Sequence, residues 1–419
     1  MRGSSFLRNA LMIVGGNGAG HLAILVAAPL LSRLYTPEQF GAYGAFTAVL
    51  LMVASVACLR FELAVPVPES DEEGARLATI ALVSAAGVGL AAGMVAQFSL
   101  WAPGGDAGLR QWAGPALGLG VIAMGAYQAA TNWAVRSRHY KVLATSRLTR
   151  SIGQVVAQLG LGALGAASTG LALGHVVGSF TGMARLSDLT ARAVLQVRPR
   201  WSELLETAKR FRRFPLYSVP SGLLNSAGNQ LPLLIVIGAY GLEVGGAFAF
   251  AQRIVAAPIT VVSQAIGQVF VGEVRRLLAS DRQRAAALYL GTIGRMAVLA
   301  VIPATLLAAL AAPAFRLAFG DQWEESGRIV SVLVPMLLTQ FAVLPVSSVL
   351  NLLGRTRLQL VYDALRIMLG LAPLLLLSRA GEGSLIAIGG YSLGMTLAVI
   401  INGAIGYLAI RQVETRADG

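Results

Sequence analysis

The sequence predicts an all-α, polytopic membrane protein with about 12 transmembrane helices in two six-helix lobes, and three observations lead to this fold class. Hydrophobic residues make up 56% of the 419 positions and charged residues only 13%, about half of the share that soluble domains carry. The apolar residues gather in about twelve stretches, each close to the ~20 residues that a helix needs to cross a bilayer. Most of the 33 Lys and Arg residues fall in alternate connections between these stretches, as the positive-inside rule describes.

The predicted spans follow one another with short polar loops between them, and no connection is long enough to form a soluble catalytic domain. The stretch 245–270 carries Pro258, so we expect a kink in that helix. The spans are 10–31, 41–62, 77–100, 113–134, 146–166, 170–187, 215–237, 245–270, 286–311, 328–351, 358–378 and 385–410.

The location of the basic residues predicts the orientation of the chain. A cytoplasmic N-terminus puts most of the Lys and Arg on the cytoplasmic side, whereas the opposite orientation inverts the pattern. We therefore expect a multi-pass protein of a bacterial inner membrane with both termini in the cytoplasm. The net charge of +13 does not indicate a nucleic-acid partner, because no tract combines basic residues with exposed aromatic ones.

A repeated segment indicates that the two halves derive from one unit. Residues 35–43 and 240–248 both fit the pattern Tyr-x-x-Glu-x-x-Gly-Ala-aromatic, and each copy follows the first span of its half. Because six spans separate the copies, the halves have the same orientation and are related by a pseudo-two-fold axis along the membrane normal. We predict an N-terminal lobe over 1–196, a cytoplasmic amphipathic linker over 197–214 and a C-terminal lobe over 215–419.

Three connections have a character of their own. In the linker, one helical face is apolar and ends in a basic cluster, which predicts an interfacial helix on the anionic inner leaflet that acts as an anchor and hinge rather than as a binding site. The acidic turn 66–74 is expected to be solvated, and 312–327 is expected to form a short amphipathic cap outside. The residues of the linker face are Trp201, Leu204, Leu205, Ala208 and Phe211, with Lys209, Arg210, Arg212 and Arg213 in the cluster.

The sequence offers little chemistry for an enzyme. Cys58 is the only cysteine, and the histidines have no carboxylate or cysteine at metal-ligand spacing, so we expect neither a metal nor a catalytic site. No nucleotide-binding motif is present. We expect no cofactor, and an energy source that is either an H⁺ or Na⁺ gradient or the downhill path of the substrate itself.

Polar residues inside the spans are the candidates for function, because a charge at the bilayer centre is costly and normally faces protein or a watery cavity. Arg253 lies deep in the eighth span and has no acidic residue within a helical turn. The pair Asp363 and Arg366 fits a structural ion pair as well as a site, and Arg147 with Arg150 fits ordinary positive-inside residues as well as a cavity wall. Arginines outnumber acids, which favours an anionic substrate. The candidates are Arg60, Glu62, Arg147, Arg150, Arg253, Arg295, Asp363 and Arg366.

The seventh span adds a polar face. Ser218, Ser221, Gly222, Asn225 and Asn229 lie three, one, three and four residues apart, which places them on one face of a helix, and the next residue is Gln230. Helix packing alone could use Ser and Gly in this way, whereas the amides suit a ligand rich in hydroxyl groups. Together the arginines and the amides predict a cavity for a sugar linked to phosphate.

Several of these segments resemble recurring segments of bacterial polysaccharide flippases, the O-antigen translocases of the multidrug/oligosaccharidyl-lipid/polysaccharide exporter superfamily. The resemblance runs from about residue 5 past residue 330 and is loose at each segment. The segments are 35–43, Leu59-Arg60-Phe61-Glu62-Leu63-Ala64, 213–221 and Gln252-Arg253.

The resemblance implies two lobes that alternate between inward- and outward-open forms. It implies transfer of an undecaprenyl-pyrophosphate-linked oligosaccharide from the cytoplasmic to the periplasmic leaflet, with Arg60, Glu62 and Arg253 on matching positions. Glu62 and Asp363 are the candidates for ion coupling. Expected partners are the lipid-linked oligosaccharide, membrane lipids and other polysaccharide-assembly proteins, with the chain itself a monomer.

Two alternatives remain beside this hypothesis, and one further relationship is set aside first. Relatives that flip the peptidoglycan lipid precursor usually have two further helices, for which this chain has no room. A cation-coupled multidrug or small-metabolite exporter would rely on acidic residues in its lobes, and acids are few in these spans. A membrane enzyme that ligates or polymerises lipid-linked glycan usually needs a larger outer loop than this sequence has.

Overall fold

The computed structural model describes residues 2–98 and 107–411, and every regular element within them is helical. This confirms the predicted all-α fold class. The elements are α1 (Arg2–Leu34), α2 (Pro37–Ala54), η1 (Phe61–Ala64), α3 (Asp71–Phe98), α4 (Ala107–Arg136), α5 (Tyr140–Ala163), α6 (Ala167–Val197), α7 (Trp201–Arg210), α8 (Arg213–Ser280), α9 (Arg282–Phe319), η2 (Asp321–Trp323), α10 (Glu324–Val343), η3 (Leu344–Val346), α11 (Val349–Leu352), α12 (Thr356–Arg379) and α13 (Ser384–Arg411).

Each predicted span falls on a helix, and six helical segments within the described ranges are long and apolar enough by themselves to cross a membrane. The second span is the main correction, because α2 ends at Ala54 and the predicted helix continued to residue 62. The tenth is interrupted near its end by η3, which begins just before Pro345. The last two residues of the span predicted over 77–100 lie outside the described residues.

The seventh and eighth spans form one long element, α8, broken at a single residue. Gly241 has φ 86° and ψ 176°, which is not helical, and glycine adopts such angles without a steric penalty. The backbone therefore leaves helical angles at Gly241, inside the predicted connection, and not at Pro258.

The helices fall into two compact units by their contacts. The first contains the chain up to residue 237 together with 241–249, and the second contains 238–240 and the chain from 250 onward. This grouping follows packing, whereas the predicted lobes follow the six-span repeat; the first part of α8 packs on α2 and so belongs to the first unit. The predicted boundary at 197–214 stays a prediction.

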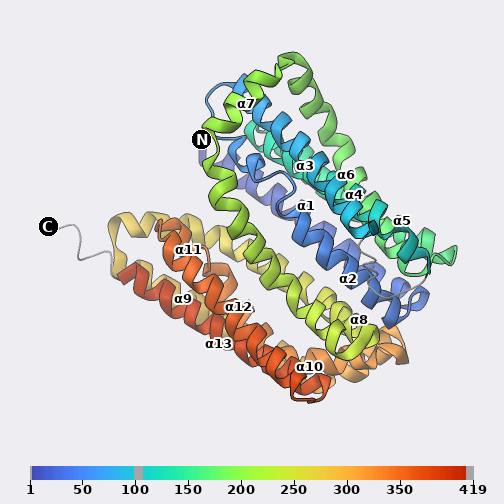
Figure 1. The fold of residues 1–419 in the computed structure, drawn as a ribbon. Coiled ribbons are helices and arrows are strands. Elements are labelled where there is room, and N and C mark those ends of the chain that lie inside the picture. Colours follow the sequence, from blue (N-terminus) through green and yellow to red (C-terminus); the bar gives the residue numbers. More distant parts are fainter. Residues whose placement is uncertain (1, 99–106, 412–419) are drawn as a thin grey trace. The chain divides into compact units, whose positions relative to one another are not determined.

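In the first unit, α3 packs with α4, α5 packs with α1 and α6, and α4 packs with α6 (Figure 1). The two copies of the repeated motif also meet here, through their glycines. A Cβ on Gly41 would overlap the carbonyl oxygen of Leu242, and a Cβ on Gly246 would overlap that of Pro37. The glycines of the motif are therefore explained by the close approach of the two backbones.

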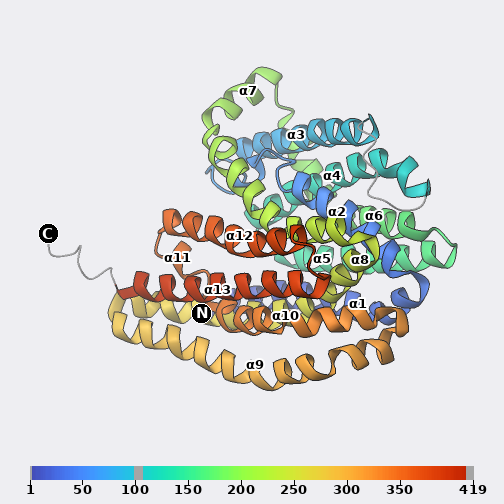
Figure 2. The same cartoon turned by 60° about the horizontal axis from the view of Figure 1, so that its bottom comes forward.

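In the second unit, α10 packs with both α9 and α13, and α12 packs with α13 (Figure 2). Its end near residue 320 is filled by an aromatic cluster, in which Phe250 lies 4.1 Å from Trp323 and 5.0 Å from Phe319 between ring centroids. Trp323 is fully buried. The segment 312–327, predicted as an amphipathic cap, is instead the end of α9, the short η2 and the start of α10, with its aromatic residues packed inward.

Candidate functional site

The connection between α2 and α3, which we call the α2–α3 segment (residues 55–70), carries Arg60 and Glu62. Its first part is a series of turns closed by backbone hydrogen bonds, such as those from Leu63 N–H to Arg60 O at 3.2 Å and from Phe61 N–H to Cys58 O at 3.0 Å. Leu59 and Arg60 have positive φ angles of 48° and 63°. Such backbone costs a non-glycine residue about 1–3 kcal/mol and persists only where surrounding contacts impose it, often at functional sites.

Arg60 and Glu62 form a loose ion pair, in which Glu62 is buried and Arg60 is half-buried. Arg60 Nη1 lies 3.8 Å from Glu62 Oε1, and the side chain of Glu62 is only 3% exposed. Within the described residues, Glu62 Oε2 and Arg60 Nε are buried and have no hydrogen-bond partner. Buried charged groups are normally fully hydrogen-bonded, so this pair retains the capacity to bind an additional group.

The first part of α8 lies against this pair. A Cβ on Gly222 would overlap the guanidinium of Arg60, so only glycine leaves room for it there. One helical turn later, Ser226 Oγ donates to Leu51 O of α2 at 3.3 Å. Asn225 and Asn229 are exposed and Gln230 is half-buried. The predicted polar face of the seventh span thus meets Arg60 at Gly222, and its amides follow along the same helix.

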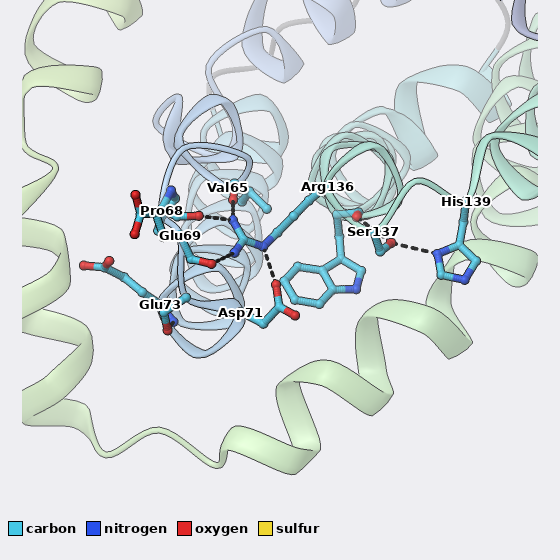
Figure 3. Close-up of polar contacts among 10 residues, drawn as sticks. Val65, Pro68, Glu69, Asp71, Glu73, Arg136, Ser137 and His139 are labelled. Carbon is cyan, nitrogen blue, oxygen red and sulfur yellow. Dashed lines mark hydrogen bonds and ion pairs between the residues drawn. The ribbon is translucent and has the colours of Figure 1, made fainter. Parts of the chain in front are cut away.

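Three residues of α4 form hydrogen bonds with the α2–α3 segment and the residues that flank it. Gln128 Nε2 donates to Ala54 O, the last carbonyl of α2, at 3.1 Å. Cys58 Sγ donates to Gly125 O at 3.2 Å. At the far end, Arg136 binds the residues that lead into α3, as Figure 3 shows.

Arg136 makes four hydrogen bonds. Its Nη1 donates to Val65 O at 3.0 Å and to Pro68 O at 2.6 Å, its Nη2 donates to Glu69 O at 3.2 Å, and its Nε donates to Asp71 Oδ1 at 3.0 Å (Figure 3). The Arg136 side chain is 8% exposed, whereas that of Asp71 is 88% exposed. The turn predicted to be acidic and solvated therefore exposes this carboxylate but directs its backbone carbonyls to a buried arginine.

The first two turns of α3 form ion pairs with α7. Arg210 Nη1 lies 2.7 Å from Glu73 Oε1, and Arg76 Nη2 lies 3.5 Å from Glu203 Oε2. Leu204 and Thr207 are buried, whereas Trp201 and Leu205 are exposed. The linker thus contains a helix, as predicted, and the predicted apolar face is divided between packing and an exposed surface.

Arg150 has a different environment from Arg60. Its Cζ lies 5.0 Å from the centroid of the Tyr127 ring, a cation–π contact. Near it in sequence, Gln154 Nε2 donates to the hydroxyl of Tyr43 at 3.4 Å, and that hydroxyl lies 3.2 Å from His175 Nδ1. Arg147 is half-buried in the same helix. The interior of the first unit therefore contains several interacting polar side chains. The sequence singled out Arg150 among them but not Gln154 or His175.

The remaining candidates lie in the second unit. Arg253 in α8 and Arg366 in α12 are half-buried. Asp363 accepts a hydrogen bond from Gln359 Nε2 at 3.2 Å, one turn earlier in α12. Arg295 is exposed, and three exposed apolar side chains share its face of α9 at helical spacing. These are Val298, Leu299 and Ile302.

Sequence reasoning missed the residues of α4 that hold the site. Arg136 follows the predicted span 113–134, so the sequence pattern groups it with the other charges of the connections. Composition does not distinguish a solvated arginine from one that binds carbonyls. Gln128 lies in an apolar span at a position that suits packing equally well. The available signal was the spacing of Gly125, Gln128 and Arg136, which puts them on one face of a helix.

Within 2–98 and 107–411, no group of three or more His, Cys, Asp or Glu residues is placed to hold a metal ion. The buried charged groups of the α2–α3 segment are instead suited to bind an anionic or protonatable ligand.

Comparison with known proteins identifies relatives of this chain. A family model described as polysaccharide biosynthesis protein matches residues 30–328. The succinoglycan biosynthesis transport protein ExoT of Rhizobium meliloti (strain 1021) is 28% identical over 316 residues, which are 74% of this chain and 61% of the relative. The chain thus spans about three fifths of the length of that curated relative.

Solved structures share the fold at low identity. The lipid II flippase MurJ in an inward closed conformation has a TM-score of 0.70 at 13% identity, over 98% of this chain and 88% of that one. The MATE transporter VcmN of Vibrio cholerae has a TM-score of 0.60 at 14% identity, over 99% and 98% of the two chains. An inward-facing multidrug resistance MATE family transporter of the MOP superfamily has a TM-score of 0.61 at 15% identity, over 98% of each chain.

These findings confirm the resemblance predicted from the sequence, and the names of the relatives are those of transporters and flippases rather than enzymes. The match covers well over half of the chain, from the end of α1 into α10. The chain is therefore a multi-pass membrane protein that belongs to the polysaccharide biosynthesis protein family.

Proposed function

We propose that this protein is a flippase that moves an undecaprenyl-pyrophosphate-linked oligosaccharide from the cytoplasmic to the periplasmic leaflet of the inner membrane by alternating access. The observation that carries the proposal is the Arg60–Glu62 pair beside Gly222 of α8, which is incompletely hydrogen-bonded and has a buried carboxylate, in a chain of the polysaccharide biosynthesis protein family. Phosphates and sugar hydroxyls do not cross hydrocarbon unpaired, because each unsatisfied polar group costs several kcal/mol.

The arginine and amide side chains have different proposed roles in binding the substrate. Arginines neutralise the pyrophosphate or acidic sugars, and amides replace water around the hydroxyl groups. The proposed anion-binding residues are Arg60, Arg147, Arg150, Arg253, Arg295 and Arg366, and the proposed amides are Asn225, Asn229 and Gln230.

Coupling to H⁺ or Na⁺ is proposed at Glu62 and Asp363. The burial of Glu62 and its Oε2 atom, which has no hydrogen-bond partner, support this role. A proton or cation bound to Glu62 would release Arg60 from its only acidic partner within the described residues. Asp363 is half-buried and accepts a hydrogen bond from Gln359.

A deletion strain tests the proposed function. We expect it to accumulate lipid-linked repeat units in the cytoplasmic leaflet and to lose surface polysaccharide, with both defects corrected by the wild-type gene but not by Arg60→Ala at equal protein level. The second candidate, a cation-coupled exporter of drugs or small metabolites, has the fold of the MATE structures in its favour. That candidate would be supported by normal lipid-linked intermediates together with increased drug sensitivity in the deletion strain.

A further inference from the structure

We propose that Gln128 and Arg136 of α4 are positioning residues, which hold the backbone of the α2–α3 segment so that Arg60 and Glu62 face their ligand. The inference rests on the proposed function of that pair. The inference extends that function by assigning a role to two residues that form hydrogen bonds with the chain on both sides of Arg60 and Glu62.

The contacts lie on one face of α4. Positions 125, 128 and 136 are three and eight residues apart, which keeps them on the same side of an α-helix. They bind, respectively, the Cys58 thiol, the Ala54 carbonyl and the carbonyls after η1. Arg60 and Glu62 therefore lie between residues that are hydrogen-bonded to α4. These hydrogen bonds determine the path of the backbone that carries the pair.

The backbone needs this support because it is strained. Two consecutive non-glycine residues, Leu59 and Arg60, have left-handed angles, which the segment adopts only if other contacts outweigh the cost. The hydrogen bonds inside the segment are local turns. The hydrogen bonds from α4 are long-range, spanning 74 residues for Gln128 and 71 for the contact of Arg136 with Val65.

Arginine is specifically suited to the far end of the segment. Its planar fork presents donors in several directions at once, and all three nitrogen atoms are used, on three carbonyls and one carboxylate (Figure 3). A lysine has one nitrogen and cannot bind four acceptors spread over residues 65–71. Arg136→Lys therefore keeps the charge but releases the segment.

The alkylation rate of the native cysteine measures how readily the segment opens. Cys58 is the only cysteine in the chain, is buried, and lies within the segment. We expect its alkylation by a maleimide in the purified full-length protein to be ~10-fold faster in Arg136→Lys and in Gln128→Leu, because opening of the segment becomes easier when a charge-assisted or buried hydrogen bond is lost. Arg192→Lys, in an exposed ion pair with Asp188, is the control and keeps the wild-type rate.

A second variant separates the carbonyl contacts from the ion pair. Asp71→Asn removes the acidic partner of Arg136 but leaves the three carbonyl contacts, so we expect a small change in the alkylation rate compared with Arg136→Lys. Equal effects of the two variants would show that Arg136 contributes a surface ion pair and would overturn its positioning role. A wild-type alkylation rate in Arg136→Lys would overturn it as well.

Export measurements on single and double variants test whether Arg136 affects transport through Arg60. In the wild-type background, Arg136→Lys is expected to lower polysaccharide export several-fold at unchanged protein level. In a background carrying Arg60→Lys that retains part of the export, the same change is expected to cause little further loss, because residues that act as one unit are not additive. Fully additive losses would place the effect of Arg136 elsewhere and contradict the proposal.

The two arms distinguish this inference from the proposed function. Alkylation of Cys58 needs no substrate, so it measures the position of the segment whatever the protein transports. If Arg136→Lys exposes Cys58 while even Arg60→Ala leaves export normal, α4 holds the segment as inferred, and the role of the pair in flipping is the part that fails.

Discussion

At the scale of single residues, the surroundings of each arginine determine what it can do. Arg136 uses all of its nitrogen atoms on fixed acceptors and is structural in its contacts. Arg60 has one long ion pair, so it can bind a ligand without first losing strong interactions. Arg295 lies on an exposed apolar face of α9, where a long side chain can extend to the membrane surface.

The comparison of two arginines in the second unit gives a prediction. Arg253→Ala should abolish surface polysaccharide at normal protein level, because a half-buried cation that neutralises phosphate is lost, and Arg253→Lys should retain part of it. Arg284→Ala, which removes an exposed arginine paired with Asp281 at the start of α9, should have a much smaller effect. Quantification of surface polysaccharide beside an immunoblot measures both, and normal polysaccharide in Arg253→Ala would remove that residue from the site.

A second prediction concerns the contact between Arg60 and α8. Gly222→Ala introduces a methyl group where the guanidinium of Arg60 lies, so Arg60 must move and export should fall although no charge changes. Gly272→Ala is the matched control, because that glycine is in the same helix and has open space around it. The assay is export at equal protein level, and equal export in the two variants would mean that the position of Arg60 does not matter.

At the scale of elements, the repeated motif is a helix start followed by a packing site. Thr36 Oγ accepts from Gln39 N–H at 3.3 Å, and Gln39 Oε1 accepts from Thr36 N–H at 3.2 Å, which is a capping box. Pro37 occupies the first helical turn, where its missing N–H is harmless. The glycine that follows in each copy then allows the two backbones to touch.

The close approach of the motif copies predicts an asymmetric response to alanine. Gly246→Ala should destabilise the purified protein by about 1–3 kcal/mol, because the new methyl group meets backbone atoms of residues 37 and 41 that cannot rotate away. Gly291→Ala in α9 meets nothing and should be neutral or slightly stabilising. Thermal unfolding in detergent compares them, and equal melting temperatures would contradict the packing described here.

α7 supports a prediction about the membrane surface. It ends shortly before a membrane-spanning segment begins, and its exposed Trp201 and Leu205 adjoin the exposed basic residues 209, 212 and 213. Replacing these three by Gln should weaken association with anionic lipid by about 1 kcal/mol for each charge. The measurement is quenching of Trp201 fluorescence by brominated anionic lipid, with Trp201→Phe as the blank and brominated zwitterionic lipid as the control. Quenching independent of lipid charge would contradict an electrostatic contact.

At the scale of the whole molecule, hydropathy predicted the helices well because a helix is the simplest way to satisfy backbone groups in lipid. It failed at the second span, since residues 55–65 are apolar enough to continue a helix, although the chain there forms turns. Those turns are possible because Gln128, Gly125 and Arg136 of α4 provide partners for them. Contacts of this kind depend on residues about 70 positions away, so a linear pattern did not reveal them, whereas the pair Arg60 and Glu62 was found from a local motif.

The predicted orientation of the whole chain can be tested with the native cysteine in place. Glu206 in α7 and Glu382 between α12 and α13 are both exposed, and the orientation inferred from the basic residues places the first in the cytoplasm and the second outside. In intact spheroplasts, a membrane-impermeant maleimide should label Glu382→Cys but not Glu206→Cys, and opening the membrane should make both reactive. Because Cys58 is buried, the unmodified protein gives the background. Labelling of Glu206→Cys alone in intact cells would invert the topology and would place the basic linker outside, against the direction of transport proposed for this protein.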